Sequence, residues 1–320
     1  MATMRIAHFS DLHLLSLDGV SMLDFANKRW IGGLNLLTNR GRHYHSHIFE
    51  AMIADINEQK VDHIVCTGDL TNLAFEQEFQ FAREYFDRLT VGDEQVTVVP
   101  GNHDTYVAAG SDYFRDIFAA YHRSDDGWHG DGEGGPWPVV RVRGQGSGRV
   151  AFIGLSTSRP TPWFTAYGRV GDEQLARLGE ILADDRLRGV MRIVALHHPP
   201  VGKAARNKVR GLRDWQAFGA VIAERGAELV IHGHEHRDMR NRIDGLDGSA
   251  IDVLGVQAGT YMASNARRIA RYRIFEVASS DTDGERPHVV GHALRMWSEE
   301  RRGFVPDTAD GDGEATAQVA

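Results

Sequence analysis

Cysteine is nearly absent from this sequence, which holds only Cys66 among its 320 residues. A disulfide framework is therefore excluded, and the position of Cys66 in an apolar run indicates a buried, inert thiol. Lysine is also scarce, since only four of the 36 basic residues are lysines. No run of about 18 apolar residues occurs, so the sequence predicts no transmembrane helix.

Other absences bear on location and partners. The N-terminus has no charged segment followed by an apolar one, so no secretory signal is predicted and a cytoplasmic protein is expected. The formal net charge of −8 argues against stable nucleic-acid binding. The composition, 42% hydrophobic and 25% charged, is typical of a globular chain that forms one large α/β domain.

Apolar runs of strand length alternate with segments of helical spacing. This predicts βαβ units with a mainly parallel sheet and, over the whole chain, a two-sheet α/β layered domain. Strands are expected at residues 5–9, 61–66, 95–100, 139–143, 149–155, 191–196, 228–231, 251–256, 271–277 and 288–294. Helices are expected at residues 48–59, 75–89, 113–121, 171–183 and 215–225.

Three further segments are predicted from composition and length. Residues 14–47 form a connection too long for an ordinary loop, which indicates either a functional segment or one that carries its own helix. Residues 125–138 are rich in Gly, Asp and Trp and are expected to be irregular. The domain should cover residues 1–303, and the acidic residues 304–320 should be a disordered tail.

Five polar clusters each close one of the apolar runs. They are Asp11-Leu12-His13, Gly68-Asp69, Gly101-Asn102-His103-Asp104, His197-His198 and Gly233-His234-Glu235-His236. Open α/β sheets place their sites at the carboxyl ends of parallel strands, where such clusters can meet. Asp, His and Asn without Cys suit divalent ions such as Mn, Fe, Zn, Co or Ni. The sequence therefore predicts one shared metal site.

The spacing within the clusters suggests two ions. On extended backbone residues i and i+2 face the same way, so Asp11 and His13 can hold one ion, and His234 and His236 repeat the pattern. Asp69 is then the carboxylate that bridges the pair. Two ions about 3.5–4 Å apart hold a phosphoryl group and lower the pKa of a shared water from about 15.7 toward 7. The resulting hydroxide attacks phosphorus in line.

The clusters, in this order over about residues 5–240, resemble the calcineurin-like metallophosphoesterase family. The resemblance implies a four-layer αββα sandwich, with two mixed β-sheets flanked by helices, and two divalent or trivalent metal ions of unfixed identity. One ion would be held by Asp11, His13, Asp69 and His236, and the other by Asp69, Asn102, His197 and His234. His103 would act on the leaving group as hydrogen-bond donor or general acid, oriented by Asp104.

Alternative readings of single residues stay open. His197 precedes a proline by two residues, as the family ligand usually does, but His198 is the alternative, because neighbours on a strand point to opposite faces. Each cluster can also be interpreted as structural and not metal-binding, such as a helix N-cap at Asp11. That interpretation requires all five clusters to occur by chance in the order found in the family. Core or supporting roles are expected for three histidines in apolar runs, namely His8, His63 and His232.

Departures from related families narrow the expected activity. Asn72 stands where purple acid phosphatases carry tyrosine, and His103 stands where the lipid A pathway hydrolases carry arginine. The segments 68–72 and 197–200 look most like bacterial class III cyclic nucleotide phosphodiesterases. We therefore expect a phosphodiesterase acting on a cyclic nucleotide or a related small molecule. The alternatives are a phosphomonoesterase or protein phosphatase on the same centre, and a non-catalytic scaffold.

Substrate specificity should lie in the loops around the metal pair. Aromatic rings beside cations can stack a base and pair with phosphate. The candidate substrate contacts are Thr71, Asn72, Trp163, Lys203 and Arg206. The apolar residues 29–37 are a candidate lid, dimer contact or peripheral membrane contact. The oligomeric state stays open.

Overall fold

The computed structural model describes residues 3–20, 44–128, 136–262, 268–280 and 285–308. Two sequence expectations lie wholly or partly outside these residues. They are the contact proposed for residues 29–37 and most of the acidic tail. Among the residues described, no helix is long and apolar enough to cross a bilayer.

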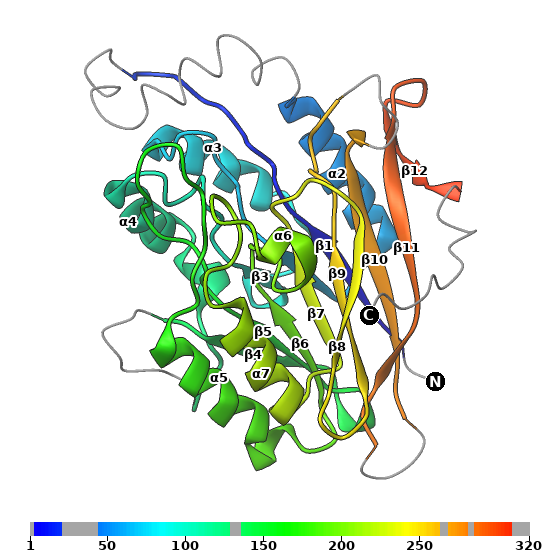
Figure 1. Ribbon diagram of the computed structural model, residues 1–320. Helices are drawn as coiled ribbons and strands as arrows, with labels where there is room; N and C mark the ends of the chain where they lie inside the picture. Colours follow the sequence, from blue (N-terminus) through cyan, green and yellow to red (C-terminus); the bar gives the residue numbers. More distant parts are fainter. Residues whose placement is uncertain (1–2, 21–43, 129–135, 263–267, 281–284, 309–320) are drawn as a thin grey trace.

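Two six-stranded sheets form the centre of the molecule (Figure 1). The first has the order β12-β11-β10-β1-β2-β3. Its strands are β1 (Thr3–Phe9), β2 (His63–Cys66), β3 (Val96–Val98), β10 (Arg271–Ala278), β11 (His288–Ser298) and β12 (Gly303–Pro306). The second has the order β4-β5-β6-β7-β9-β8. Its strands are β4 (Val139–Arg143), β5 (Val150–Gly154), β6 (Met191–Ala195), β7 (Leu229–His232), β8 (Met239–Asp244) and β9 (Ala250–Gly255).

Both sheets are mixed rather than mainly parallel. The parallel pairs are β1–β2 and β2–β3 in the first sheet, and β5–β6, β6–β7 and β7–β9 in the second. The strands β10 to β12, β4 and β8 are antiparallel to their neighbours. The parallel pairs lie side by side with their carboxyl ends at one edge of each sheet, and this places several strand ends together.

Helices cover the outer face of each sheet. They are α2 (Ser46–Gln59), α3 (Glu76–Phe86), α4 (Ala108–Ile117), α5 (Asp172–Ala183), the single turn α6 (Gly202–Ala205) and α7 (Trp215–Arg225). Short 3-10 turns occupy Asp93–Gln95, Ala119–His122, Gly146–Gly148 and Asp185–Leu187. Helices α2, α3 and α4 share one apolar core with the first sheet, and α5 and α7 share another with the second. The expected αββα sandwich is confirmed.

A third core fills the space between the sheets. Ile6 and Phe275 of the first sheet pack with Phe152 and Ile231 of the second. His63 lies in this interior with its ring stacked on Phe152 at a centroid distance of 3.6 Å. His8, His63 and His232 are all fully buried, as the sequence predicted for core histidines.

Several elements differ from the sequence expectations, among them the turn α6, which was not predicted. Helix α4 begins at Ala108, five residues earlier than predicted. Strand β8 was not predicted, because it alternates polar side chains at a sheet edge and has no apolar run. Residues 304–306, assigned to the disordered tail, belong to β12, where Phe304 packs on Trp297. The boundary at residue 303 is therefore wrong, and the ion pair between Arg271 and Asp307 extends the ordered domain further.

Candidate metal centre

Five loops that follow parallel strands converge on one site. Asp11 and His13 follow β1, and Asp69 follows β2. Asn102 follows β3, while His197 and the pair His234 and His236 follow β6 and β7 of the second sheet. The two sheets face one another (Figure 1), and side chains from the loops of both form the groups described below. The site is therefore built by both halves of the sandwich.

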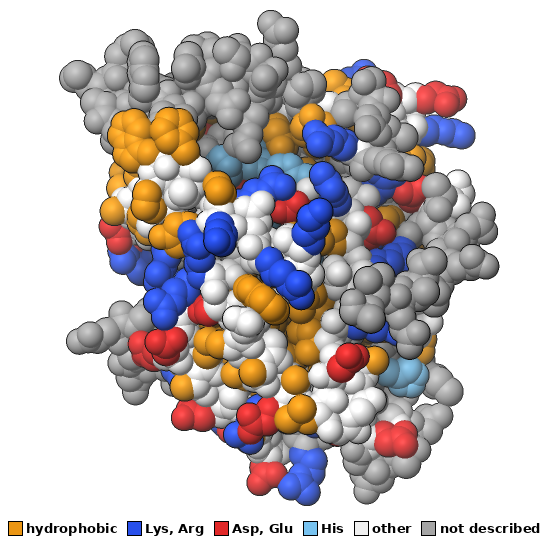
Figure 2. Space-filling model, in the orientation of Figure 1, with side chains coloured by type: hydrophobic (Ala, Val, Ile, Leu, Met, Phe, Trp, Pro, Cys, Tyr) orange, Lys and Arg blue, Asp and Glu red, His pale blue; other side chains and the backbone are white. Residues whose placement is uncertain are grey.

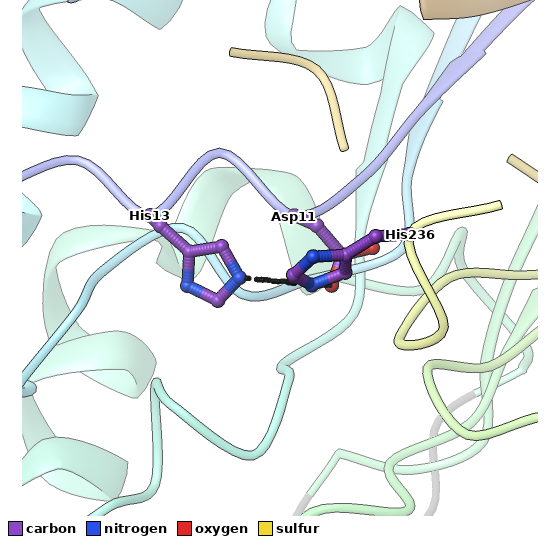
Figure 3. A group of neighbouring side chains, drawn as sticks. All are labelled: Asp11, His13 and His236. Atoms are coloured by element: carbon purple, nitrogen blue, oxygen red, sulfur yellow. Dashed lines mark hydrogen bonds and ion pairs between the residues drawn. The ribbon is translucent and has the colours of Figure 1, made fainter. Parts of the chain in front are cut away.

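The first ligand group consists of Asp11, His13 and His236 (Figure 3). Nε2 of His236 lies 3.1 Å from Oδ1 of Asp11 and 3.2 Å from Nε2 of His13. Two neutral imidazole nitrogens that face each other at this distance repel, unless a proton or a metal ion lies between them. Tyr44 holds the other side of the His236 ring, with its Oη 3.1 Å from Nδ1.

The second ligand group is Asp69, His197 and His234, with Asn102 beside them. Nε2 of His197 lies 3.4 Å from Oδ2 of Asp69, 3.2 Å from Nδ1 of His234 and 3.2 Å from Oδ1 of Asn102. Nδ1 of His197 is fixed by the carbonyl of Thr67 at 2.7 Å, which leaves Nε2 as the ligand atom.

Asp69 lies between the two groups. Its Oδ2 is 3.7 Å from Nε2 of His13 and 3.4 Å from Nε2 of His197. Its Oδ1 accepts a hydrogen bond of 2.7 Å from the backbone N–H of His103. This arrangement suits a carboxylate shared by two ions.

The donor set fits a pair of metal ions. Oδ1 of Asp11 is buried and accepts no hydrogen bond from the described residues, although its side chain is fully enclosed. A buried carboxylate oxygen without a donor is costly unless a cation satisfies it. Carboxylate, imidazole and amide oxygen together suit borderline-hard divalent ions. The residues therefore fit the binuclear centre typical of the family.

Five of the ligand residues adopt a left-handed backbone conformation that the sequence did not predict. Asp11, His13, Asp69, His234 and His236 all have positive φ, between 46° and 73°. The expectation of an extended Asp-x-His element is therefore wrong. Non-glycine residues in this region cost about 1–3 kcal/mol each, so the surrounding fold must hold them there.

The loops after β2 and β3 lie in very close contact. A Cβ atom on Gly101 would lie 2.1 Å from Oδ1 of Asp69, and one on Gly68 would lie 2.3 Å from the backbone N of Gly101. Gly68 also has a φ of +93°. Glycine is required at both positions, because a side chain at Gly101 would displace the Asp69 carboxylate and one at Gly68 would overlap the backbone of Gly101.

Charges in the site are strongly coupled. Burial opposes a positive charge on His197, but the carboxylate of Asp69 outweighs it and raises the pKa of His197 to about 9. Burial would raise the pKa of Asp69, yet the charges of His197 and His103 hold it well below its usual range. A metal ion held by His197 would take the place of that proton, so we expect metal uptake to be favoured at higher pH.

The structure brings His197, and not His198, into the ligand group. The ring of His198 is occupied by other partners, since Nδ1 lies 2.7 Å from Oγ1 of Thr157 and Nε2 lies 3.1 Å from the carbonyl of Ala166. Burial, followed by the charge of His197, lowers the pKa of His198 to about 3. His198 therefore supports the loop as a neutral residue.

The predicted role of Asp104 in orienting His103 needs correction. The carboxylate of Asp104 accepts hydrogen bonds from the backbone N–H groups of Gly101 and Thr71 and from Oγ1 of Thr71. Nδ1 of His103 instead lies 2.6 Å from the carbonyl of Asn72. Asp104 therefore ties the loops together, and Asn72 orients His103 through its backbone.

The predicted substrate contacts do not line the site. Thr71 and Asn72 are buried and do not line the cavity, and the side-chain amide of Asn72 donates to the carbonyl of His13. Trp163, Lys203 and Arg206 lie on neighbouring segments and outside the cavity wall. The guanidinium of Arg206 stacks instead on a tryptophan ring, that of Trp215.

A cavity of about 490 Å³ opens above the ligands, and His103 lines it. Its wall includes residues not singled out as candidate substrate contacts, namely Tyr44, Ala166, Arg210, Glu235, Arg237, Tyr261 and Arg268. Arg210 lies in a basic segment visible in the sequence, but the tyrosines and the other arginines carry no local signal. They reach the site only through tertiary packing.

Known proteins share this fold. The family model described as calcineurin-like phosphoesterase matches residues 4–238. A dimetal phosphatase from Danio rerio is similar, with a TM-score of 0.59, 13% identity, and coverage of 95% of this chain and 98% of the other. A purple acid phosphatase from yellow lupin has a TM-score of 0.56 and 12% identity, with coverage of 100% of this chain and 57% of the other. A candidate 5′-nucleotidase from Staphylococcus aureus has a TM-score of 0.52 and 14% identity, with coverage of 92% of this chain and 54% of the other.

The chain spans about half the length of the last two structures. No curated protein matches the sequence.

Proposed function

The chain belongs to the calcineurin-like phosphoesterase family, and on this premise we propose that it is a metal-dependent phosphodiesterase of small molecules. The observation that carries the proposal is the pair of ligand groups at one cavity, with the Asp69 carboxylate between them and His103 in the cavity wall. Family membership implies a metal-dependent phosphoric ester hydrolase. The choice of a diester, such as a cyclic nucleotide, is the finer part of the proposal.

The shape of the cavity supports a diester. Its wall extends past the first ligand group to Tyr44 and Tyr261, and past the second to Ala166 and Arg210. The carbonyl of Arg210 accepts a hydrogen bond of 2.9 Å from Nε2 of His234, which fixes that side of the wall. Space beyond both groups suits a phosphorus atom with two substituents.

Two ions bound by these groups would polarise the phosphoryl oxygens and lower the pKa of a bound water. The protein supplies the rest. Asp69 and the histidines would hold the ions, and His103 lines the cavity, where it can act as a proton donor. An imidazolium whose Nδ1–H donates to the carbonyl of Asn72 can offer Nε2–H to a leaving oxygen.

A second candidate is hydrolysis of a phosphomonoester, including a phosphoprotein, at the same centre. Three arginines line the cavity, Arg210, Arg237 and Arg268, and they suit the additional negative charge of a monoester. A non-catalytic scaffold is disfavoured, because every ligand position and His103 are present.

The test compares bis(p-nitrophenyl) phosphate with p-nitrophenyl phosphate on protein reconstituted with Mn, Fe, Zn, Co or Ni. The proposal expects faster turnover of the diester. His103→Ala should keep its metals, by elemental analysis, while diester cleavage slows about 10²–10⁴-fold. Faster turnover of the monoester would favour the second candidate. If none of these metals supports turnover of the diester, the phosphodiesterase proposal is wrong. Cyclic nucleotides, glycerophosphodiesters and dinucleotides then form the panel of natural substrates.

A further inference from the structure

Two hydrogen-bonded segments beside the cavity expose an apolar tip formed by Trp163, Phe164 and Val209. Their exposed fractions are 56%, 77% and 51%. The backbone N–H of Ala166 donates to the carbonyl of Val209 at 2.9 Å, which fixes the two segments side by side. Large apolar side chains grouped in water need an explanation, because a monomeric surface rarely keeps them together without a partner.

Hydrogen bonds hold the turn that carries Phe164 in one defined backbone conformation. Phe164 has a φ of 63°, which is a genuine outlier for a bulky residue. Hydrogen bonds hold this conformation, since Oγ1 of Thr161 donates to the carbonyl of Thr165 and Oγ1 of Thr165 donates to that of Pro162, both at 2.7 Å. The fold thus maintains strain that presents an aromatic ring to solvent.

The same two segments are strongly basic in an acidic protein. Residues 157–169 contain two arginines, and residues 199–213 contain two lysines and three arginines, while neither segment contains Asp or Glu. The net charge of the whole chain is −8. Figure 2 shows basic side chains gathered around the hollow that holds the histidines, with hydrophobic side chains beside it. Arg210 pairs with Glu235 at 3.2 Å, whereas the exposed Lys203 and Lys208 have no ion pair among the described residues.

We propose that this tip docks on an anionic lipid bilayer and seats the cavity at the membrane surface. Exposed apolar side chains on segments that also carry cations match an interface of acyl chains under anionic headgroups. Val209 is aliphatic and offers no stacking surface, which favours lipid over single-stranded nucleic acid. Ala166 and Arg210 belong both to these segments and to the cavity wall, so docking here places the metal centre beside the headgroups.

The test is co-sedimentation of the full metal-loaded chain with vesicles of phosphatidylcholine alone or mixed with phosphatidylglycerol. Binding should require the anionic lipid and weaken as salt is added. The double variant Phe164→Ser/Val209→Ser should bind at least about tenfold more weakly, since it removes apolar area. Lys208→Glu should also weaken binding. Leu246→Ser is the matched control, because Leu246 is 80% exposed on another loop.

Equal binding by the double variant and the wild type overturns the proposal, as does equal binding to both kinds of vesicle. Tighter binding to a single-stranded oligonucleotide than to the anionic vesicles also overturns it, in favour of nucleic acid. Turnover of soluble bis(p-nitrophenyl) phosphate should be the same in all variants, which excludes misfolding. Vesicle binding requires no turnover, so its failure is distinct from failure of the phosphodiesterase proposal.

Discussion

Asp69 is the residue on which both ligand groups depend, because its carboxylate lies between His13 and His197. Asp69→Ala should therefore lose both metal ions, whereas Asn102→Ala, at the margin of the second group, should mainly weaken one. Elemental analysis of the purified variants measures the difference. Loss of a single ion in both variants would show that Asp69 does not bridge.

Tyr44 is expected to position a ligand without touching the metal. Its Oη lies 3.1 Å from Nδ1 of His236 and fixes the orientation of that ring. Removing such a partner typically costs 10–100-fold in metal affinity, so Tyr44→Phe should bind the more weakly held metal about tenfold less tightly. Chelator competition measures this affinity. Tyr261→Phe is the matched control, since Tyr261 packs on Tyr44 with ring centroids 5.1 Å apart and should leave the affinity unchanged.

Residues of the centre differ in how far the sequence could predict them. Asp11, His13 and His236 were identifiable because ligand chemistry restricts residue type and their motifs are short. Tyr44 was not, because its role depends on a contact across 192 positions of the chain. The partner of His103 was missed for another reason: a backbone carbonyl, that of Asn72, has no sequence signature.

At the scale of elements, the contact between the loops after β2 and β3 should tolerate no side chain. Gly101→Ala would place a methyl group 2.1 Å from Oδ1 of Asp69, so we expect loss of bound metal and a lower melting temperature. Gly219→Ala is the matched control. A Cβ at Gly219 meets nothing within 4 Å in helix α7, and the change should stabilise by about 0.5–1 kcal/mol. Normal metal content in Gly101→Ala would contradict the close contact.

The interior between the sheets should make stability depend on pH. Burial, with the charges of Arg143 and Arg141, lowers the pKa of His63 well below 6.5. Below pH 6.5 the unfolded chain therefore gains a proton that the folded chain excludes, and stability falls as pH falls. His63→Phe should remove about 2 kcal/mol of the loss between pH 7 and pH 5.

Urea unfolding at both pH values gives the free energies. The exposed His288 supplies the control variant, His288→Gln, which should keep the full pH dependence. If the stability of His63→Phe depends on pH as strongly as that of the wild type, other titratable groups cause the pH dependence.

Elements were predictable where the core dictates them. Strands β2 and β6 are buried at every position, as is β1 from Ile6 to Phe9, and their mostly apolar residues marked them as strands. Strand β8 lies at an edge, and only backbone pairing with β9 marks it as a strand. Strand β12 follows a charged turn, and its place is decided by Phe304 packing on residues distant in sequence.

At the scale of the molecule, metal should act as a link between the two sheets. The first sheet supplies Asp11 and Asp69, and the second supplies His197 and His234. Bound metal should stabilise the fold by about 2.7 kcal/mol when its free concentration is 100 times Kd. Calorimetry before and after chelation, with metal added back, measures the shift. An unchanged melting temperature would show that the ligands are held equally well without metal.

Sheet order also has a consequence for the order of synthesis. All candidate ligands precede residue 238, yet the loop that bears two of them depends on chain made later. The backbone N–H of Gly259 donates to the carbonyl of Ser10 at 2.8 Å, and Oγ1 of Thr260 donates to that of Leu12 at 2.5 Å. Strand β10 then pairs along β1. We therefore expect the loop that bears Asp11 and His13 to take up this geometry only after residues 259–278 have been made.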